Sequence, residues 1–100
     1  MTTAARTHLV LIPSYDTGSL LCETVAGARA HWPVVWVVID GSTDGSDALL
    51  AQRFGDDPGV RMLRLPRNAG KGAALLHGLD EAAAAGFTHA LTMDADGQHP

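Results

Sequence analysis

Two aspartates stand two positions apart near the carboxyl end of the sequence, and they are the residues best suited to chemistry. Asp94 and Asp96 follow an apolar run, residues 87–93, and Gly97 permits a turn directly after them. Carboxylates at the carboxyl edge of an open α/β sheet face the crevice in which such folds bind ligands. They suit a hard divalent cation that also holds phosphate oxygens. The alternative is an acidic turn that caps whatever follows.

Four apolar runs separated by three helical patterns must position these carboxylates. The runs at residues 9–12, 34–39, 60–65 and 87–93 predict strands. Pro13 ends the first strand, because the residue before a proline prefers extended geometry. Three helical patterns lie between the strands. The first follows Ser19, and the second includes Leu49, Leu50 and Phe54. The third occupies residues 73–85, with Gly86 as its cap. This β-α-β-α-β-α-β order predicts a Rossmann-like α/β fold with a parallel sheet and right-handed crossovers.

The strands differ in how deeply they should be buried. Residues 34–39 are apolar on both alternations, which predicts a central strand covered on both faces. Residues 60–65 include Arg61 and Arg64, which favours a place near the sheet edge. Residues 87–93 read as a short buried strand.

Polar residues follow every predicted strand. Because carboxyl ends of parallel strands meet at one edge, the pattern gathers these loops along a single margin. The gathered residues are Tyr15 and Asp16, Asp40 to Asp44 with Asp44 or Ser46 as a helix cap, Asn68 to Lys71, and Asp94 to Gln98.

The bulk properties narrow the class of protein. A chain of 100 residues has room for one domain, and its net charge of −4 without a basic cluster argues against a nucleic-acid partner. The lone Cys22 fits a reducing cytoplasm. The longest apolar runs are far shorter than the roughly 20 residues of a membrane span.

Several better-known motifs are absent. The first strand is not followed by the glycine-rich dinucleotide fingerprint, and Gly70-Lys71-Gly72 lacks the spacing of a phosphate-binding P-loop. A calcium loop starting at Asp40 would have Ala51 where a glutamate is needed. The Asp94 motif is similar to that of haloacid-dehalogenase-like phosphatases, but there it follows the first strand.

Four blocks of the sequence, in order, resemble the family 2 glycosyltransferases, and most closely their dolichyl-phosphate mannose synthase and polyprenyl-phosphate glycosyltransferase branch. The blocks are residues 11–16 (LIPSYD), 37–46 (VVIDGSTDGS), 68–74 (NAGKGAA) and 93–100 (MDADGQHP). The resemblance implies the N-terminal half of a GT-A fold with strand order 3-2-1-4. It also implies a nucleotide diphosphate sugar as ligand, UDP- or GDP-linked, with Mg²⁺ or Mn²⁺ as cofactor.

The resemblance assigns the nucleoside end of the site to the first two loops. Pro13 and Tyr15 would line the nucleobase pocket, with the phenol ring packing on the base. Asp16 stands where the family more often has Asn, and it is either a donor-binding residue or a loop cap. Asp40 would accept a hydrogen bond from the base or ribose; the alternative is a turn carboxylate that binds loop N–H groups.

The resemblance assigns the diphosphate and the metal to the other two blocks. Lys71 could meet the diphosphate with its ammonium and the amino end of a helix, and the alternative is a solvated side chain. Asp94 would touch the ribose or the sugar, and Asp96 with Gln98 would hold the metal.

The expected function is the donor-binding half of an inverting glycosyltransferase that passes the sugar to an acceptor such as a polyprenyl phosphate or a glycan. Residues 1–100 would form one partial GT-A domain, truncated at its carboxyl end and inactive alone. No catalytic base can be assigned, because the acceptor-side residues of the family would lie beyond Pro100. The full-length protein would be cytoplasmic, at the inner face of the membrane in membrane-linked members.

The open edge of the fourth strand would favour self-association. Two other functions are weighed against the glycosyltransferase. One is a non-catalytic nucleotide-binding or assembly module of the same fold. The other is a nucleotidyltransferase, against which Pro13-Ser14-Tyr15 speaks.

Overall fold

The computed structural model describes residues 8–16, 18–41 and 44–93. Strands and helices alternate along the chain, in the predicted order. The elements are β1 His8–Ser14, α1 Leu20–His31, β2 Val35–Asp40, α2 Ser46–Phe54, β3 Val60–Leu65, α3 Lys71–Ala84 and β4 His89–Thr92.

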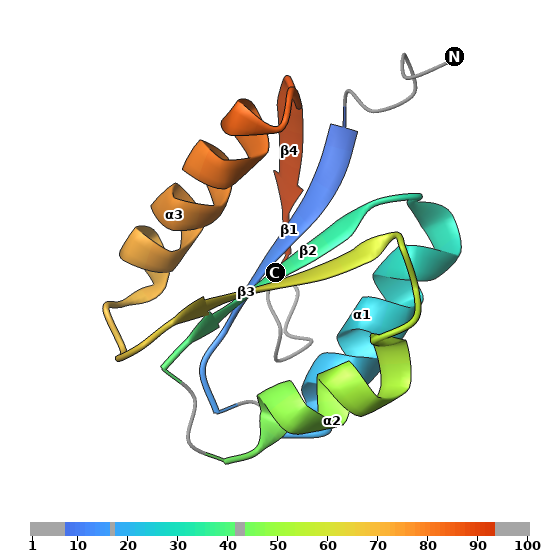
Figure 1. Ribbon diagram of the computed structural model, residues 1–100, viewed down its shortest axis with the longest axis vertical. Coiled ribbons are helices and arrows are strands. Elements are labelled where there is room, and N and C mark those ends of the chain that lie inside the picture. The colour runs from blue at the N-terminus through green and yellow to red at the C-terminus, as the bar shows by residue number, and fades with distance from the viewer. Residues whose placement is uncertain (1–7, 17, 42–43, 94–100) are drawn as a thin grey trace.

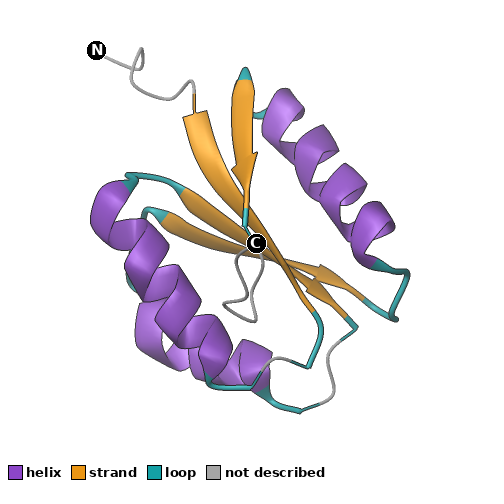
Figure 2. Ribbon diagram, turned by 180° about the vertical axis from the view of Figure 1, so that it is seen from behind, coloured by secondary structure: helices purple, strands orange, loops and turns teal. Residues whose placement is uncertain are grey.

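The strands form one parallel sheet in the order β3-β2-β1-β4, as the family resemblance implied. Helices α1 and α2 cover one face of this sheet and α3 covers the other (Figure 1 and, from behind, Figure 2). In β2, Val35, Val37 and Ile39 face α1 and α2, whereas Trp36 and Val38 face α3. The prediction of a central strand buried on both faces is therefore confirmed.

The first strand continues through Pro13, which was expected to end it, and finishes at Ser14. The sheet tolerates this proline for a geometric reason. Val10 donates its N–H to Val34 on the β2 side, and Leu11 accepts the N–H of Met93 on the β4 side. By this alternation the missing N–H of Pro13 falls on the β4 side. The paired residues of β4 reach only as far as Leu11, so no ladder bond is lost there.

Helix α3 lies close to the sheet and ends as predicted. A methyl group at Gly78 would collide with the side chains of Leu11 and Val38, so glycine permits this close approach. At the other end the Phe87 N–H donates to Ala82 at 3.0 Å and Gly86, at φ +97°, donates to Ala83 at 3.1 Å. This pair of bonds is the Schellman motif, which confirms Gly86 as the cap.

The fourth strand was expected to be buried, and that prediction is wrong. β4 is mostly exposed, and Leu91 keeps 46% of its surface accessible. The reason is its position: among the described strands β4 pairs with β1 alone, while α3 packs over β1 and β2. β3, at the opposite edge, carries exposed Arg61 and Arg64 as predicted.

None of the helices in the described part of the chain is both long enough and apolar enough to cross a membrane.

Candidate functional site

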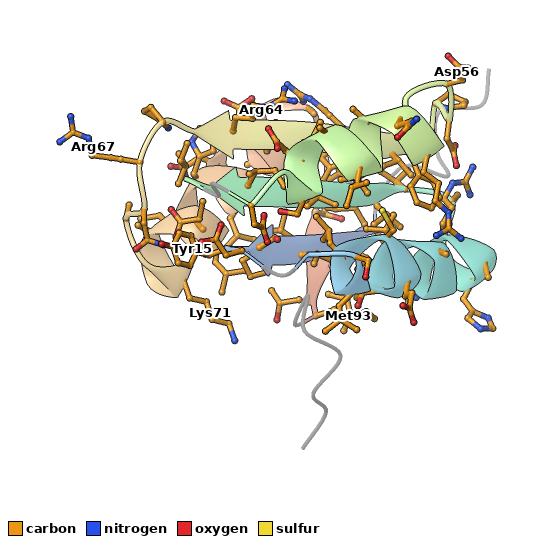
Figure 3. The ribbon with its side chains drawn as sticks, turned by 90° about the horizontal axis from the view of Figure 1, so that it is seen from below. Tyr15, Asp56, Arg64, Arg67, Lys71 and Met93 are labelled. Carbon is orange, nitrogen blue, oxygen red and sulfur yellow. The ribbon has the colours of Figure 1, made fainter. Side chains whose placement is uncertain are left out.

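Three of the four strands end level with one another and form a common margin. Ser14 pairs with Ile39, and Asp40 pairs with Leu65, so β1, β2 and β3 finish within one residue of each other. Figure 3 shows Tyr15 and Lys71 at this end of the molecule. The Tyr15 side chain is 50% exposed there, which leaves its ring available for packing on a planar ligand.

Two carboxylates connect the loop after β1 to the loop after β2. The Asp44 N–H donates to Oδ1 of Asp16 at 3.3 Å, and the Gly18 N–H donates to Oδ2 of Asp44 at 2.9 Å. Asp16 has a φ of +48°, a conformation that Asp tolerates in turns. Asp16 therefore acts in the structure as a loop residue, and its role in binding a donor stays a prediction.

Asp44 also holds the start of α2. Its Oδ1 accepts the N–H of Ser46, the first residue of α2, at 3.0 Å. The prediction that Asp44 or Ser46 caps this helix is wrong, because the N-cap is Gly45 and no side chain caps it. The bond from Ser46, together with the bond from Gly18, keeps the pKa of the Asp44 carboxyl below its ordinary value, because both N–H groups favour the charged form.

Asp40 connects the end of β2 to the loop after β3. The carboxylate accepts the N–H of Ala69 on Oδ1 at 2.8 Å, and on Oδ2 the N–H of Gly70 at 3.0 Å and Nδ2 of Asn68 at 3.2 Å. The Asn68 amide also donates to the backbone oxygen of Asp40 at 3.3 Å. Asp40 is 3% exposed. We call Asp40 and residues 68–70 the clasp.

The clasp uses most of the hydrogen-bonding capacity of Asp40. A carboxylate has roughly four acceptor positions, and the clasp fills three of them. Asp40 thus does what the alternative interpretation of the sequence foresaw, binding loop N–H groups. A direct contact between Asp40 and a base or ribose stays a prediction.

Gly41 allows the two loops to meet. Its φ is +71°, and a methyl group built on it would collide with the backbone of Arg67 and Asn68. A side chain is therefore excluded here both by conformation and by space.

Lys71 is the first residue of α3, two positions before the predicted start of this helix. The helix has no acidic residue in its first turn, and its N-cap, Gly70, makes no side-chain cap. The N–H groups of the first turn and the helix dipole therefore favour an anion at this end. The predicted contact between Lys71 and a diphosphate stays a prediction.

The remaining predicted residues are placed less directly. Pro13 is buried within β1. Its predicted place in the wall of a nucleobase pocket stays a prediction. Asp94, Asp96 and Gln98 lie outside the described residues. Among the residues that are described, no group of three or more His, Cys, Asp or Glu could hold a metal ion.

The expected position of the catalytic base stays a prediction as well. Pro100, beyond which the acceptor-side residues were expected, lies outside the described residues, which end at Met93.

The described part of the strand that leads to Asp94 ends before the common margin. Thr92 pairs with Leu11, three residues before the end of β1, and the Met93 N–H donates to the oxygen of Leu11 at 3.1 Å. The fourth predicted loop, residues 94–98, lies outside the described residues, so its place at this margin stays a prediction.

The sequence reasoning named Asn68 only as part of a loop and Asp44 only as a loop residue or helix cap, although both connect neighbouring loops in the structure. The available signal was their type and position, since Asn and Asp directly after strands commonly bind nearby backbone groups. The partner loop could not be read from the sequence, because it depends on which strands are neighbours.

Known proteins resemble this chain along most of its length. The sequence profile of the family described as Glycosyl transferase family 2 matches residues 9–100. The polyprenol monophosphomannose synthase of Mycolicibacterium smegmatis is 36% identical over 94 residues, which cover 91% of this chain and 36% of that protein.

A solved structure shares the fold. The mannosyltransferase PcManGT from Pyrobaculum calidifontis, in complex with GDP-Man and Mn²⁺, matches with a TM-score of 0.70 at 23% identity, over 90% of this chain and 27% of that one. This likeness agrees with the expected GT-A arrangement. The chain thus spans about a third of the length of these two proteins. With its strand order, its level margin and a profile match over residues 9–100, the chain belongs to glycosyltransferase family 2.

Proposed function

We propose that this chain forms the donor-binding part of a metal-dependent, inverting glycosyltransferase that transfers mannose from GDP-mannose to a polyprenyl phosphate. The observation that carries the proposal is the level margin of β1, β2 and β3, where adjoining polar loops are connected by hydrogen bonds beside an exposed tyrosine. The choice of mannose and acceptor is supported by the name of the Mycolicibacterium relative, and GDP and Mn²⁺ by the ligands of the Pyrobaculum structure.

Residues at the margin suit the two ends of a nucleotide diphosphate. In the proposal the Tyr15 ring packs on the base, and Pro13 and Asp16 support or contact the nucleoside. Lys71 and the amino end of α3 receive the diphosphate, where the ammonium and the helix dipole both favour negative charge.

The motif after β4 completes the proposed site. Asp94 contacts the ribose or the sugar, and Asp96 with Gln98 offers hard oxygen ligands of the kind that Mg²⁺ and Mn²⁺ prefer. A bound divalent cation would neutralise the negative charge that develops on the departing nucleotide diphosphate.

The acceptor is a phosphate oxygen in this proposal. It forms a bond to the anomeric carbon as the bond from that carbon to the diphosphate oxygen breaks, which inverts the configuration. Because a polyprenyl phosphate is already anionic, no protein base has to remove a proton. Such an acceptor would hold the full-length protein at the inner face of the membrane, where we expect it.

Titration calorimetry with GDP and with UDP, each with and without Mn²⁺, tests the proposal. We expect the wild-type protein to bind GDP more tightly with Mn²⁺ than without it, and Asp96→Ala to abolish this difference. Asp56→Ala is the matched control, because Asp56 is exposed at the opposite end of the molecule (Figure 3).

Two outcomes would contradict the proposal in different ways. Metal-dependent binding that survives Asp96→Ala would show that the metal assignment is wrong. Tight binding of GDP that never depends on metal would favour the alternative, a non-catalytic nucleotide-binding module of the same fold.

A further inference from the structure

The clasp lies directly before the residue that is proposed to meet the diphosphate. Gly70, whose N–H donates to Asp40, is the N-cap of α3, and Lys71 follows it as the first helical residue. Ala69, the other backbone donor, lies two residues before Lys71. The carboxylate of Asp40 therefore fixes the two peptide groups that lead into the amino end of α3.

The clasp is more than a packing contact, because it fixes orientation at several points. Both oxygens of Asp40 are used, and Asn68 contacts both the side chain and the backbone of Asp40. Hydrogen bonds to a charged acceptor are stronger than neutral ones, and this acceptor is shielded from water at 3% exposure. The loop is thereby ordered before any ligand arrives, which removes an entropic cost of binding.

We propose that Asp40 and Asn68 are positioning residues, which orient Lys71 and the amino end of α3 toward the diphosphate of the donor. Asp40 thus serves the diphosphate end of the site through the loop after β3. This inference rests on the proposed function, since it requires a nucleotide diphosphate as the ligand.

The inference separates the two ends of the nucleotide. If Asp40 acts through the clasp, its loss weakens the binding of GDP but hardly affects guanosine, which has no diphosphate. If Asp40 contacts the base or ribose directly, its loss weakens both ligands by the same factor. The ratio of the two affinities is therefore a readout that a general loss of stability would not move.

The variant Asp40→Asn keeps the size of the side chain but turns one acceptor oxygen into a donor that faces a loop N–H. We expect it to lower the affinity for GDP, measured by calorimetry with Mn²⁺, about tenfold, the loss of roughly one charge-assisted hydrogen bond. The affinity for guanosine should change less than about twofold on the same scale. Asp56→Asn removes the same charge at the far end of the molecule and should change neither.

Asn68→Ala gives a second variant that leaves the carboxylate and its two backbone donors in place. It should lower GDP affinity selectively and by a smaller factor than Asp40→Asn, even where Asp40→Asn folds poorly. In a Lys71→Ala background, Asp40→Asn should lower GDP affinity by a smaller factor than in the wild type, because part of its effect passes through Lys71.

Equal losses for GDP and guanosine in Asp40→Asn would overturn the positioning role, and so would additive effects of Asp40→Asn and Lys71→Ala. A wild-type protein that binds neither GDP nor UDP would contradict the proposed function itself. The two failures are therefore distinguishable in one set of titrations.

Discussion

In the described part of the chain, hydrogen bonds between neighbouring loops hold the loops after β1, β2 and β3, whereas β4 pairs with only one strand. Asp44 and Asp40 each accept hydrogen bonds from an adjoining loop, and Asp40 is 3% exposed while doing so. In β4, Leu91 is 46% exposed, and the strand pairs with β1 alone. The comparison teaches that the nucleoside and diphosphate side of the proposed site is preorganised, while the strand leading to the proposed metal ligands has fewer contacts that support it.

The two edge strands of the sheet also differ, in how strongly their side chains oppose pairing with another strand. On β3, Arg61 lies 3.5 Å from Glu81 and stacks over Trp36, and Arg64 lies 3.5 Å from Asp47. Charged side chains of this kind discourage pairing with another strand. β4, with the sequence His-Ala-Leu-Thr, has no Lys, Arg, Asp or Glu. We therefore expect β4, and not β3, to be the edge that accepts another strand.

The largest effect in this comparison is expected from Gly41→Ala. The new methyl group meets the backbone of Arg67 and Asn68 in a left-handed conformation. We expect the free energy of unfolding to fall by roughly 3 kcal/mol or more, the sum of conformational strain and overpacking. Urea unfolding followed by circular dichroism measures this loss.

Gly45→Ala is the matched control, since Gly45 has a φ of +82° but no atom of the described residues within 4 Å of an added methyl group. It should cost only the conformational part, roughly 1–2 kcal/mol. Equal losses for the two variants would mean that the loop after β3 does not press on Gly41.

A smaller effect is expected from acid, through Asp44. The folded pKa of this carboxyl is lowered, chiefly by the Ser46 N–H, so its contribution to stability is present above the unfolded value of about 3.9. That contribution is lost as the pH falls through the lower folded value. Stability measured from pH 6 to pH 2 should therefore decline less steeply in Asp44→Asn than in the wild type.

Asp57 provides a check on this prediction. Its pKa is also lowered, first by the Gly59 N–H and then by Arg29, so part of the acid sensitivity should remain in Asp44→Asn. Identical acid profiles for wild type and Asp44→Asn would mean that the bonds from Gly18 and Ser46 do not stabilise the folded state.

The smallest effect on stability, and the clearest on association, is expected from Leu91→Lys. Because Leu91 is exposed, the free energy of unfolding should change by less than about 0.5 kcal/mol. If the protein self-associates through β4, sedimentation velocity should show this variant as less associated than the wild type, because an edge lysine opposes strand pairing.

Leu76→Lys is the control for hydrophobicity, since Leu76 is 60% exposed on α3 and lies outside the sheet. Association that falls equally in both variants would assign it to a general apolar surface and not to the strand edge.

Much of the fold could be predicted from the sequence because local chemistry decides it. The doubly apolar run of β2, the arginines of β3 and Gly86 after α3 each specify a burial pattern or a backbone conformation by themselves. The family resemblance supplied the strand order, which periodicity alone does not give.

The rest depended on distances between strands. The exposure of β4 follows from where α3 lies, and the clasp follows from β2 and β3 being neighbours with Asp40 level with Leu65. The type of Asp40 was consistent with a ligand contact and with a loop contact, and its partners show the loop contact. The metal residues Asp94, Asp96 and Gln98 remain predictions from the family resemblance.

Native-state hydrogen exchange tests the contrast between the clasp and β4 most directly. Loop amides usually exchange quickly, but those of Ala69 and Gly70 donate to a buried carboxylate. We predict that they exchange more slowly than the amide of Met93, which donates to Leu11 at the end of the exposed edge strand. Faster exchange at Ala69 and Gly70 than at Met93 would contradict a preorganised margin.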